Sequence, residues 1–213
     1  MAIWVNKNTR LVCQGITGSA GKTSAKDFLV AALRSSFPLA HGPYKSFNND
    51  IGVPQTLLRM RASHRASVVE LGMNHSGEIA QLAAMAQPTV ALVNNAQREH
   101  QEFMGTVEAV AQENGAVISA LPTDGVAVFP AHDVYSALWH KLAGARQCMR
   151  FAMETAAHAA AEVQLRSAQW TGEAWQVQAD TPAGALHVQL HIAGLHNVGN
   201  ALAATACALA AGV

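Results

Sequence analysis

Residues 15–24 read G-I-T-G-S-A-G-K-T-S, between the apolar run Leu11–Ile16 and a helical pattern that begins near Ala25. Glycines in such a turn let backbone N–H groups converge on an anion, and a following Lys-Thr pair can reach the phosphates and Mg²⁺. The usual loop, G-x-x-x-x-G-K-[ST], has a glycine where this chain has Ile16. The stretch predicts a nucleotide loop with altered spacing. The alternative is a bare strand-to-helix turn with a solvated lysine.

Short apolar runs alternate with helical patterns through the first two thirds of the chain. The runs that predict strands are Leu11–Ile16, Ser67–Leu71, Thr89–Asn94 and Gly125–Phe129. The intervening segments that predict helices are Ala25–Ser35, Gly52–Met60, Ser76–Ala86, Thr106–Leu121 and Asp133–Leu142. Nearly continuous apolar strands joined by helices are typical of a parallel sheet with helices on both faces.

The pattern changes after about Arg150. Three segments then alternate apolar and polar residues, namely Glu162–Arg166, Ala174–Asp180 and Ala185–Ile192. This alternation predicts a small antiparallel meander within residues 150–193, and an Ala-rich helix follows from residues 194–197 onward. We therefore expect an α/β fold over residues 1–213, treated as a single domain, with a mostly parallel P-loop-type sheet and a meander near the C-terminus.

Composition narrows the functional classes. The 14 basic and 14 acidic side chains balance, which argues against broad binding to nucleic acid. Charges interrupt every apolar stretch before the length that a membrane span needs, about 20 residues. The cysteines Cys13, Cys148 and Cys207 are scattered, as expected for reduced residues in a cytoplasmic protein.

Polar side chains follow the second and third expected strands. Glu70 ends the run Ser67–Leu71 at the carboxyl edge of the sheet, where open α/β sheets bind ligands. A carboxylate there can ligate the Mg²⁺ ion of a bound triphosphate, and a buried carboxylate without a cation would destabilise the fold. Asn94 and Asn95 end the next run, and His100 follows within one loop. By itself His100 fits a structural or solvated histidine better than a ligand.

Five segments together resemble the Mur ligase family. They are T-G-S-A-G-K-T (17–23), S-F-N-N-D-I-G-V-P (46–54), V-V-E-L-G-M-N-H-S-G-E-I (68–79), V-N-N-A-Q-R-E-H (93–100) and G-L-H-N-V-G-N-A-L (194–202). The resemblance covers residues 15–213 and is to the central, ATP-binding domain. Within the family the segments are most similar to members that add D-alanyl-D-alanine to a UDP-muramoyl tripeptide. The family's loop has the spacing found here, which accounts for Ile16.

The resemblance implies ATP and Mg²⁺ as cofactors and assigns roles to individual residues. Nucleotide contacts are implied for Gly18, Ser19, Ala20, Gly21, Lys22, Thr23, Ser24, Asn95, His196, Asn197 and Asn200. Metal contacts are implied for Thr23, Glu70 and His100, and catalytic roles for Lys22, Glu70 and His100. Contacts with the UDP-muramoyl peptide are implied for Ser46, Asn48, Asn49 and Asp50. Asn197 is also a candidate helix N-cap. The implied reaction passes through an acyl phosphate, which the amine of D-alanyl-D-alanine then attacks.

Two features depart from the family pattern. Many members carry a carbamylated lysine that bridges a second metal, and this chain has Glu113-Asn114 in that region. Either Glu113 supplies the oxygen ligand or the second metal site is weak. The family's N- and C-terminal domains are also absent, so we expect an isolated central domain that ligates inefficiently alone. Surfaces normally covered by those domains would favour self-association.

The first 18 residues instead resemble the start of the succinyl-CoA ligase α-subunit, which suggests a recombined or engineered chain with a foreign first strand. An α/β module that keeps the motifs without performing chemistry is therefore an alternative. A CoA- or dinucleotide-binding protein is a weaker one, because such a site has no use for Lys22-Thr23.

Overall fold

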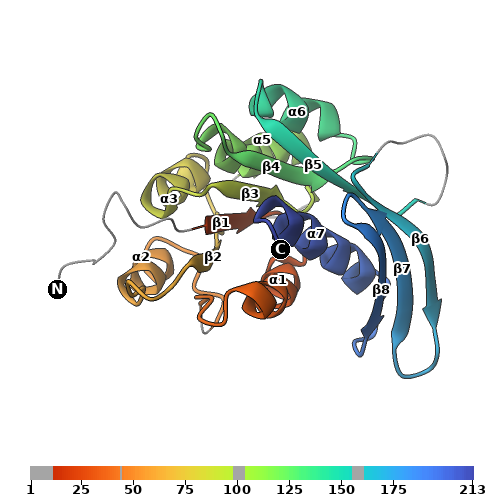
Figure 1. Ribbon diagram of the computed structural model, residues 1–213. Coiled ribbons are helices and arrows are strands. Elements are labelled where there is room, and N and C mark those ends of the chain that lie inside the picture. The colour runs from red at the N-terminus through yellow and green to blue at the C-terminus, as the bar shows by residue number, and fades with distance from the viewer. Residues whose placement is uncertain (1–11, 44, 98–103, 155–160) are drawn as a thin grey trace.

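The computed structural model describes residues 12–43, 45–97, 104–154 and 161–213 (Figure 1). In these residues eight strands form one sheet in the order β2-β1-β3-β4-β5-β6-β7-β8. The strands are β1 Val12–Thr17, β2 Ala66–Glu70, β3 Val90–Val93, β4 Val126–Pro130, β5 Gln147–Ala152, β6 Val163–Trp170, β7 Trp175–Thr181 and β8 Gly184–Leu190. The helices are α1 Lys22–Ser36, α2 Gly52–Leu58, α3 Glu78–Ala86, α5 Val107–Ser119, α6 Ser136–Ala143 and α7 His196–Ala210.

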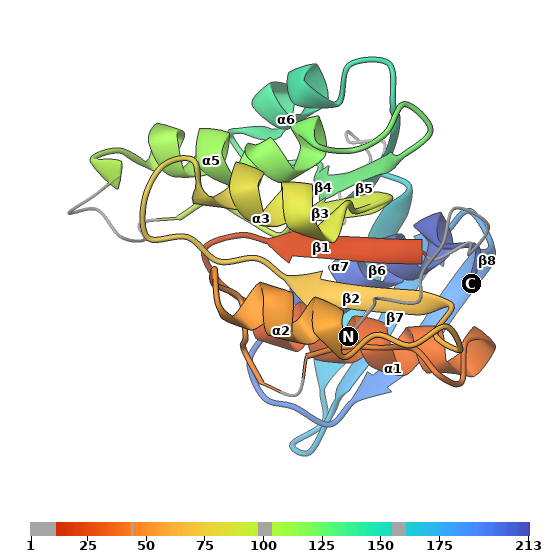
Figure 2. The same cartoon turned by 90° about the vertical axis from the view of Figure 1, so that its left-hand side faces the viewer.

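The sheet is parallel from β2 to β6 and antiparallel from β6 to β8. Figure 2 shows β1 between β2 and β3, with α2 and α3 in front of the sheet. The chain reverses its direction of winding at this point, between β1 and β3. Open α/β sheets bind ligands just outside the carboxyl ends of the strands at such a switch point.

The predicted α/β fold with an antiparallel C-terminal part is confirmed. One parallel strand, β5, was not expected from the sequence. The meander is continuous with the main sheet, because β6 pairs in parallel with β5 through Phe151 and Val163. Strand β1 is the second strand of the sheet and pairs with β2 and β3, and the suggestion of a foreign first strand stays a hypothesis.

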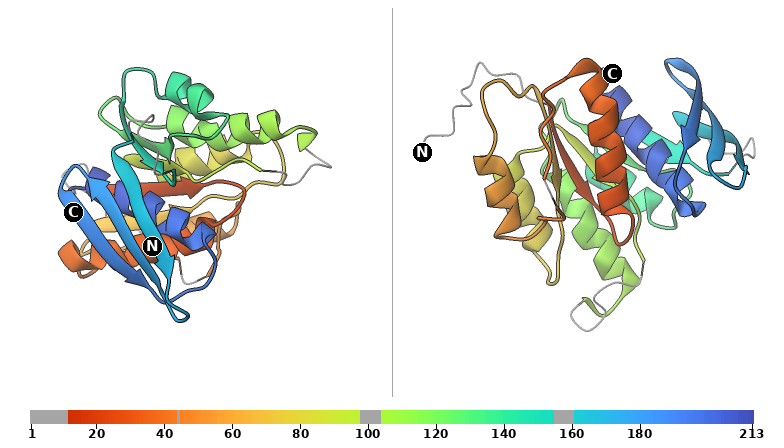
Figure 3. Two further views of the ribbon diagram at one scale, coloured as in Figure 1. Left: turned by 90° about the vertical axis from the view of Figure 1, so that its right-hand side faces the viewer. Right: turned by 90° about the horizontal axis from the view of Figure 1, so that it is seen from below.

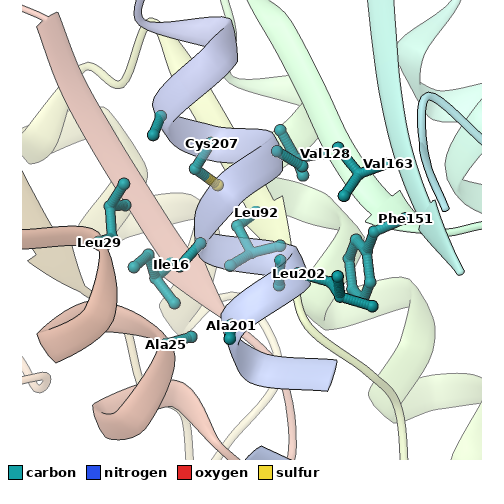
Figure 4. Packing of buried hydrophobic residues seen from close by; sticks show 14 of the residues in the cluster. Ile16, Ala25, Leu29, Leu92, Val128, Phe151, Val163, Ala201, Leu202 and Cys207 are labelled. Atoms are coloured by element: carbon teal, nitrogen blue, oxygen red, sulfur yellow. The ribbon is translucent and has the colours of Figure 1, made fainter. Parts of the chain in front are cut away.

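Two apolar cores lie on opposite faces of the sheet. Helices α1 and α7 pack on one face, while α2, α3, α5 and α6 pack on the other (Figure 3, right). Figure 4 shows Ile16 and Leu202 in the first core, where β1 and α7 meet. Both are fully buried, and each such side chain stabilises the fold by about 1.5–3 kcal/mol. This packing fixes the starts of α1 and α7 near the carboxyl ends of the strands.

The antiparallel strands extend beyond the parallel sheet beside α7 (Figure 1). Val163, Leu165 and Val177 from their inner face join the α7 core. The alternate residues are more exposed, which explains the alternating sequence pattern. None of the described helices is both long and apolar enough to cross a membrane.

His41 and His64 stack beside the edge strand β2, with ring centroids 4.9 Å apart. The His41 backbone extends the sheet edge, because its N–H donates to the Ala66 carbonyl and its carbonyl accepts from the Val68 N–H, each at 2.8 Å. The His41 Nε2 atom donates to the Thr56 carbonyl at 2.8 Å. This segment covers the edge of β2, which would otherwise be open to pairing with another chain.

Lowering the pH from about 7.5 to about 5.5 is expected to destabilise the chain through this histidine pair. Burial is the main reason that the pKa of each histidine lies below its usual 6.5, and the positive charge of Arg61 lowers both pKa values further. The folded state therefore binds these protons less readily than the unfolded state, so this stabilisation is complete above about pH 6.5 and is lost as pH falls below it.

Urea unfolding midpoints at the two pH values measure the effect, with His64→Asn as the comparison. The variant should lose part of the pH dependence, because one of the two titrating rings is gone. An unchanged pH dependence in His64→Asn would contradict the assignment.

Candidate active site

The glycine-rich loop joins β1 to α1 at the carboxyl end of β1, which lies between β2 and β3. Gly18 and Gly21 have φ angles of 131° and 76°, in the region that favours glycine. A Cβ atom on Gly21 would overlap the side-chain oxygen of Asn200. Helix α1 begins at Lys22, directly after Gly21, and the first N–H groups of a helix have no partner within it. The loop thus places these donors and the positive helix end at the switch point, as an anion site requires.

Asparagines after β3 hold this loop in place. Asn95 Oδ1 accepts from the Ala20 N–H at 2.9 Å, and the Asn95 carbonyl accepts from the Ser19 N–H at 3.2 Å. Asn94 Nδ2 donates to the Ala20 carbonyl at 2.7 Å and to Asn200 Oδ1 at 3.0 Å. The loop is therefore braced before any ligand binds. Asn95 was expected at the site, whereas the brace from Asn94 was not foreseen.

Lys22 and Thr23 point to the side of the loop that faces β2. Lys22 Nζ donates to the Gly18 carbonyl at 2.6 Å, so the ammonium group lies over the loop. Thr23 Oγ1 lies 3.2 Å from Glu70 Oε2 and 3.0 Å from Ser46 Oγ. Lys22, Thr23, Ser46 and Glu70, which come from three separate sequence segments, thus meet at the start of α1.

Glu70 is almost fully buried, with 1% exposure. Its Oε1 atom accepts from Asn48 Nδ2 at 2.9 Å, and its Oε2 atom accepts from Thr23 Oγ1 at 3.2 Å. Both partners are neutral, and within the described ranges no ion pair involves Glu70. A buried carboxylate among neutral oxygen-bearing groups suits a hard cation, and carboxylate and hydroxyl oxygens are ligands that Mg²⁺ accepts. Glu70 and Thr23 therefore fit a magnesium site.

A cavity of about 260 Å³ lies beside Lys22, on the β2 side of the loop. The loop Asn48–Asp50, the segment Gly72–Asn74, and Glu78 and Gln81 of α3 line it. The predicted substrate residues are therefore next to the predicted phosphate-binding lysine. Their side chains also have structural partners, since Asn49 Oδ1 accepts from the Gly52 N–H at 2.8 Å.

A larger cavity of about 580 Å³ lies on the other side of the loop, above β3, β4 and β5. Residues after β1, β3, β4 and β5 line it, together with the first turns of α7. Its volume is within the range of small-molecule sites, about 300–1,000 Å³. The loop thus stands between two cavities, with Gly21 lining the larger and Lys22 the smaller.

The first turn of α7 is tied to the loop by amides. Asn200 Nδ2 donates to Asn197 Oδ1 at 3.2 Å, and Asn197 Nδ2 donates to the Ala193 carbonyl at 2.7 Å. His196 and Asn200 line the larger cavity, whereas Asn197 lies behind them with 3% exposure. The alternative role of Asn197 as a helix N-cap is wrong, because α7 begins at His196 and the cap position is Leu195.

Glu113 has a structural role that the sequence did not reveal. Its Oε2 and Oε1 atoms accept from the N–H groups of Gly77 and Ile79, each at 2.9 Å, at the start of α3. Both carboxylate oxygens are thus engaged, which argues against Glu113 as a metal ligand. The neighbouring Asn114 accepts a 2.6 Å hydrogen bond from Thr17 Oγ1 at the end of β1.

His100 lies outside the described residues, so its predicted metal contact stays a prediction. Within the described ranges no cluster of three or more histidine, cysteine, aspartate or glutamate side chains could hold a metal. Glu70 is the acidic residue that contacts Thr23 at the start of α1, and Asn48 lies beside it.

Comparison with known families agrees with this geometry. The family model described as the Mur ligase middle domain matches residues 16–208. The chain belongs to the Mur ligase family. The UDP-N-acetylmuramoyl-tripeptide–D-alanyl-D-alanine ligase of Escherichia coli (strain K12) is 35% identical over 212 residues, which is 100% of this chain and 46% of that enzyme. The corresponding ligase of Haemophilus influenzae is 32% identical over 215 residues, again 100% of this chain and 46% of the relative.

Solved Mur ligases share the fold. A crystal structure of MurF from Acinetobacter baumannii superposes with a TM-score of 0.89 at 34% identity, covering 97% of this chain and 44% of that one. MurF from Thermotoga maritima, in complex with ADP, superposes with a TM-score of 0.78 at 22% identity, covering 92% and 44% of the two chains. The chain thus spans about half the length of the Mur ligases that it matches.

Proposed function

We propose that this chain is the ATP- and Mg²⁺-binding domain of a cytoplasmic ligase that adds D-alanyl-D-alanine to UDP-N-acetylmuramoyl tripeptide. The observation that carries the proposal is the position of the loop between two cavities. Lys22, Thr23 and Glu70 all lie on the side of the smaller cavity. The substrates follow from the names of the E. coli and H. influenzae relatives, and ADP in the T. maritima structure supports the nucleotide.

The arrangement gives the bound nucleotide a direction. The backbone donors of the loop take the phosphates, and the nucleoside extends into the larger cavity above β3, β4 and β5. The terminal phosphate then faces Lys22 and the smaller cavity. The acceptor carboxylate of the tripeptide would enter from this second side, so that the two reactants meet at the start of α1.

The residues of the chain mainly position reactants and stabilise charge. The tripeptide carboxylate attacks the terminal phosphorus, ADP leaves, and the amine of D-alanyl-D-alanine then displaces phosphate from the acyl phosphate. Lys22 stabilises the negative charge that spreads over the transferred phosphoryl group. Glu70 and Thr23 would hold Mg²⁺, which neutralises phosphate charge when bound. Asn48 orients the Glu70 carboxylate by its hydrogen bond to Oε1.

Replacing Glu70 with glutamine tests the proposal. Glutamine preserves the shape and most hydrogen-bonding capacity of the side chain but removes its charge. Calorimetric titration should show that Mg²⁺ strengthens ATP binding to the parent chain, and that this gain falls about tenfold or more in Glu70→Gln. Glu173→Gln, an exposed change in the β6–β7 turn, is the matched control and should retain the full gain.

Two outcomes would contradict the proposed function. One is a parent chain that binds no ATP in the presence of Mg²⁺. The other is a Glu70→Gln chain whose Mg²⁺-dependent gain equals that of Glu173→Gln, because the buried carboxylate would then have no part in metal binding.

A further inference from the structure

The larger cavity contains a polar pair that no role assigned so far uses. His132 and Glu154 lie at the end of the cavity farthest from the phosphate loop. We propose that this pair binds the 2′- and 3′-hydroxyl groups of the nucleotide's sugar and so selects ribonucleotides. The inference rests on the proposed function, because it requires a nucleotide whose phosphates lie at the loop.

The position of the pair follows from the strand order. His132 comes two residues after the end of β4, and Glu154 comes two residues after the end of β5. Neighbouring strands are about 4.8 Å apart, so these two strands lie roughly 10 and 14 Å from β1 across the sheet. When the phosphates of a nucleotide lie at Gly21, its nucleoside can therefore reach His132 and Glu154, whereas its phosphates cannot.

The chemistry of the pair fits neutral hydroxyl donors. Glu154 Oε2 lies 3.9 Å from His132 Nε2, which is longer than a hydrogen bond, so the carboxylate keeps capacity to accept other donors. The side chains are 57% and 32% exposed, respectively, so both are accessible to a ligand. A carboxylate repels phosphate but accepts hydrogen bonds from hydroxyl groups, and two adjacent hydroxyls can satisfy its two oxygens.

The remaining walls of the cavity suit the base. Phe151 and Met153 supply apolar and polarisable surface, on which a planar ring can lie. Asn200 and His196 on α7 form the wall nearest the loop-bracing amides and offer donors and acceptors to ring nitrogens. If the base lies beside α7 and the phosphates lie at the loop, the sugar lies near the carboxyl ends of β4 and β5.

The same pair could accept a hydrogen bond from an amino group of the base, and the test must separate the two. Titration of the full chain with MgATP, its 2′,3′-dideoxy analogue and purine riboside triphosphate does so. The dideoxy analogue lacks the two sugar hydroxyls, whereas purine riboside triphosphate keeps them and lacks the amino group of the base. The variants are Glu154→Ala and, as the exposed control, Glu173→Ala.

We expect the parent chain and Glu173→Ala to bind MgATP about fivefold or more tightly than the dideoxy analogue, as a hydrogen bond to a charged acceptor predicts. Glu154→Ala should bind MgATP and the dideoxy analogue with equal affinity. Relative to the parent chain, it should lose affinity for MgATP and for purine riboside triphosphate but not for the dideoxy analogue.

Equal affinities of the parent chain for MgATP and the dideoxy analogue would overturn the inference. The inference would also be overturned if Glu154→Ala weakened the binding of MgATP but not that of purine riboside triphosphate, because the pair would then contact the base. In both cases the proposed function stands, provided that MgATP binding still depends on Glu70. If the parent chain binds no nucleotide, the proposed function and this inference fail together.

Discussion

Replacing Lys22 with alanine is expected to weaken MgATP binding by about 100-fold or more. Lys22 is the first residue of α1, and its ammonium group is held over the loop by a 2.6 Å bond to the Gly18 carbonyl. A phosphate bound at the helix start would therefore lie beside a positioned charge. Removing one partner of a desolvated, hydrogen-bonded charge pair costs about 2–5 kcal/mol, which corresponds to about 30-fold to several thousand-fold in affinity.

Calorimetry with MgATP measures this effect, and Lys141→Ala is the matched control. Lys141 is an exposed lysine on α6, outside both cavities, so its replacement should leave affinity unchanged. The urea midpoint of Lys22→Ala should stay close to that of the parent chain, which separates lost binding from lost folding. Affinity in Lys22→Ala within about threefold of Lys141→Ala would contradict a phosphate-binding role, given the expected size of the effect.

The parallel part of the sheet could be predicted because its strands are buried on both faces. Such strands, Val90–Val93 for example, read as uninterrupted apolar runs. Strand β5, Gln147–Ala152, did not show this signal, since Gln147, Cys148 and Arg150 are only partly buried or exposed. Its pattern resembles that of the antiparallel strands that follow. The meander was therefore expected to begin at about Arg150, which lies within β5.

The predicted site residues came from local patterns and from the resemblance to the Mur ligases, and the structure brings most of the described ones together. Lys22, Thr23 and Glu70 meet because parallel strands end at one edge of the sheet. The residues that support them were less visible. Asn94 was known only as one of two amides after a strand, yet it links the loop to α7. That role depends on a contact between residues 106 positions apart, which no local pattern encodes.

The start of α3 shows the same limit. Ser76, which is followed by Glu78 and Ile79, is the residue that local sequence favours as the N-cap, because serine often caps a helix that begins a residue or two later. In the structure the cap position is Gly77, with φ 91°, and no side chain caps the helix locally. Glu113 caps it from α5 instead.

Two successive residues of α5 therefore connect the two halves of the site. Glu113 holds the start of α3, whose residues Glu78 and Gln81 line the smaller cavity. Asn114 holds Thr17, the last residue of the strand that leads into the phosphate loop. The wall of the acceptor cavity and the base of the phosphate loop thus share one rigid support, which fixes their separation.

Replacing Glu113 with alanine is accordingly expected to destabilise the chain by about 2–4 kcal/mol, because it leaves buried N–H groups without partners and removes a negative charge from a helix N-terminus. Glu113 is 7% exposed, so water cannot readily replace the lost carboxylate. Glu113→Gln should lose less stability than Glu113→Ala, since the amide oxygen can still accept a hydrogen bond from the Gly77 or Ile79 N–H.

Urea unfolding measures these losses, with Glu108→Ala on the first turn of the same helix as control. Glu108 is exposed, so its replacement should cost no more than about 0.3–1 kcal/mol from the helix dipole. The order of stability should be the parent chain, Glu108→Ala, Glu113→Gln and then Glu113→Ala. A Glu113→Ala chain as stable as Glu108→Ala would show that the start of α3 does not need this carboxylate, and that α5 does not couple the two cavities through it.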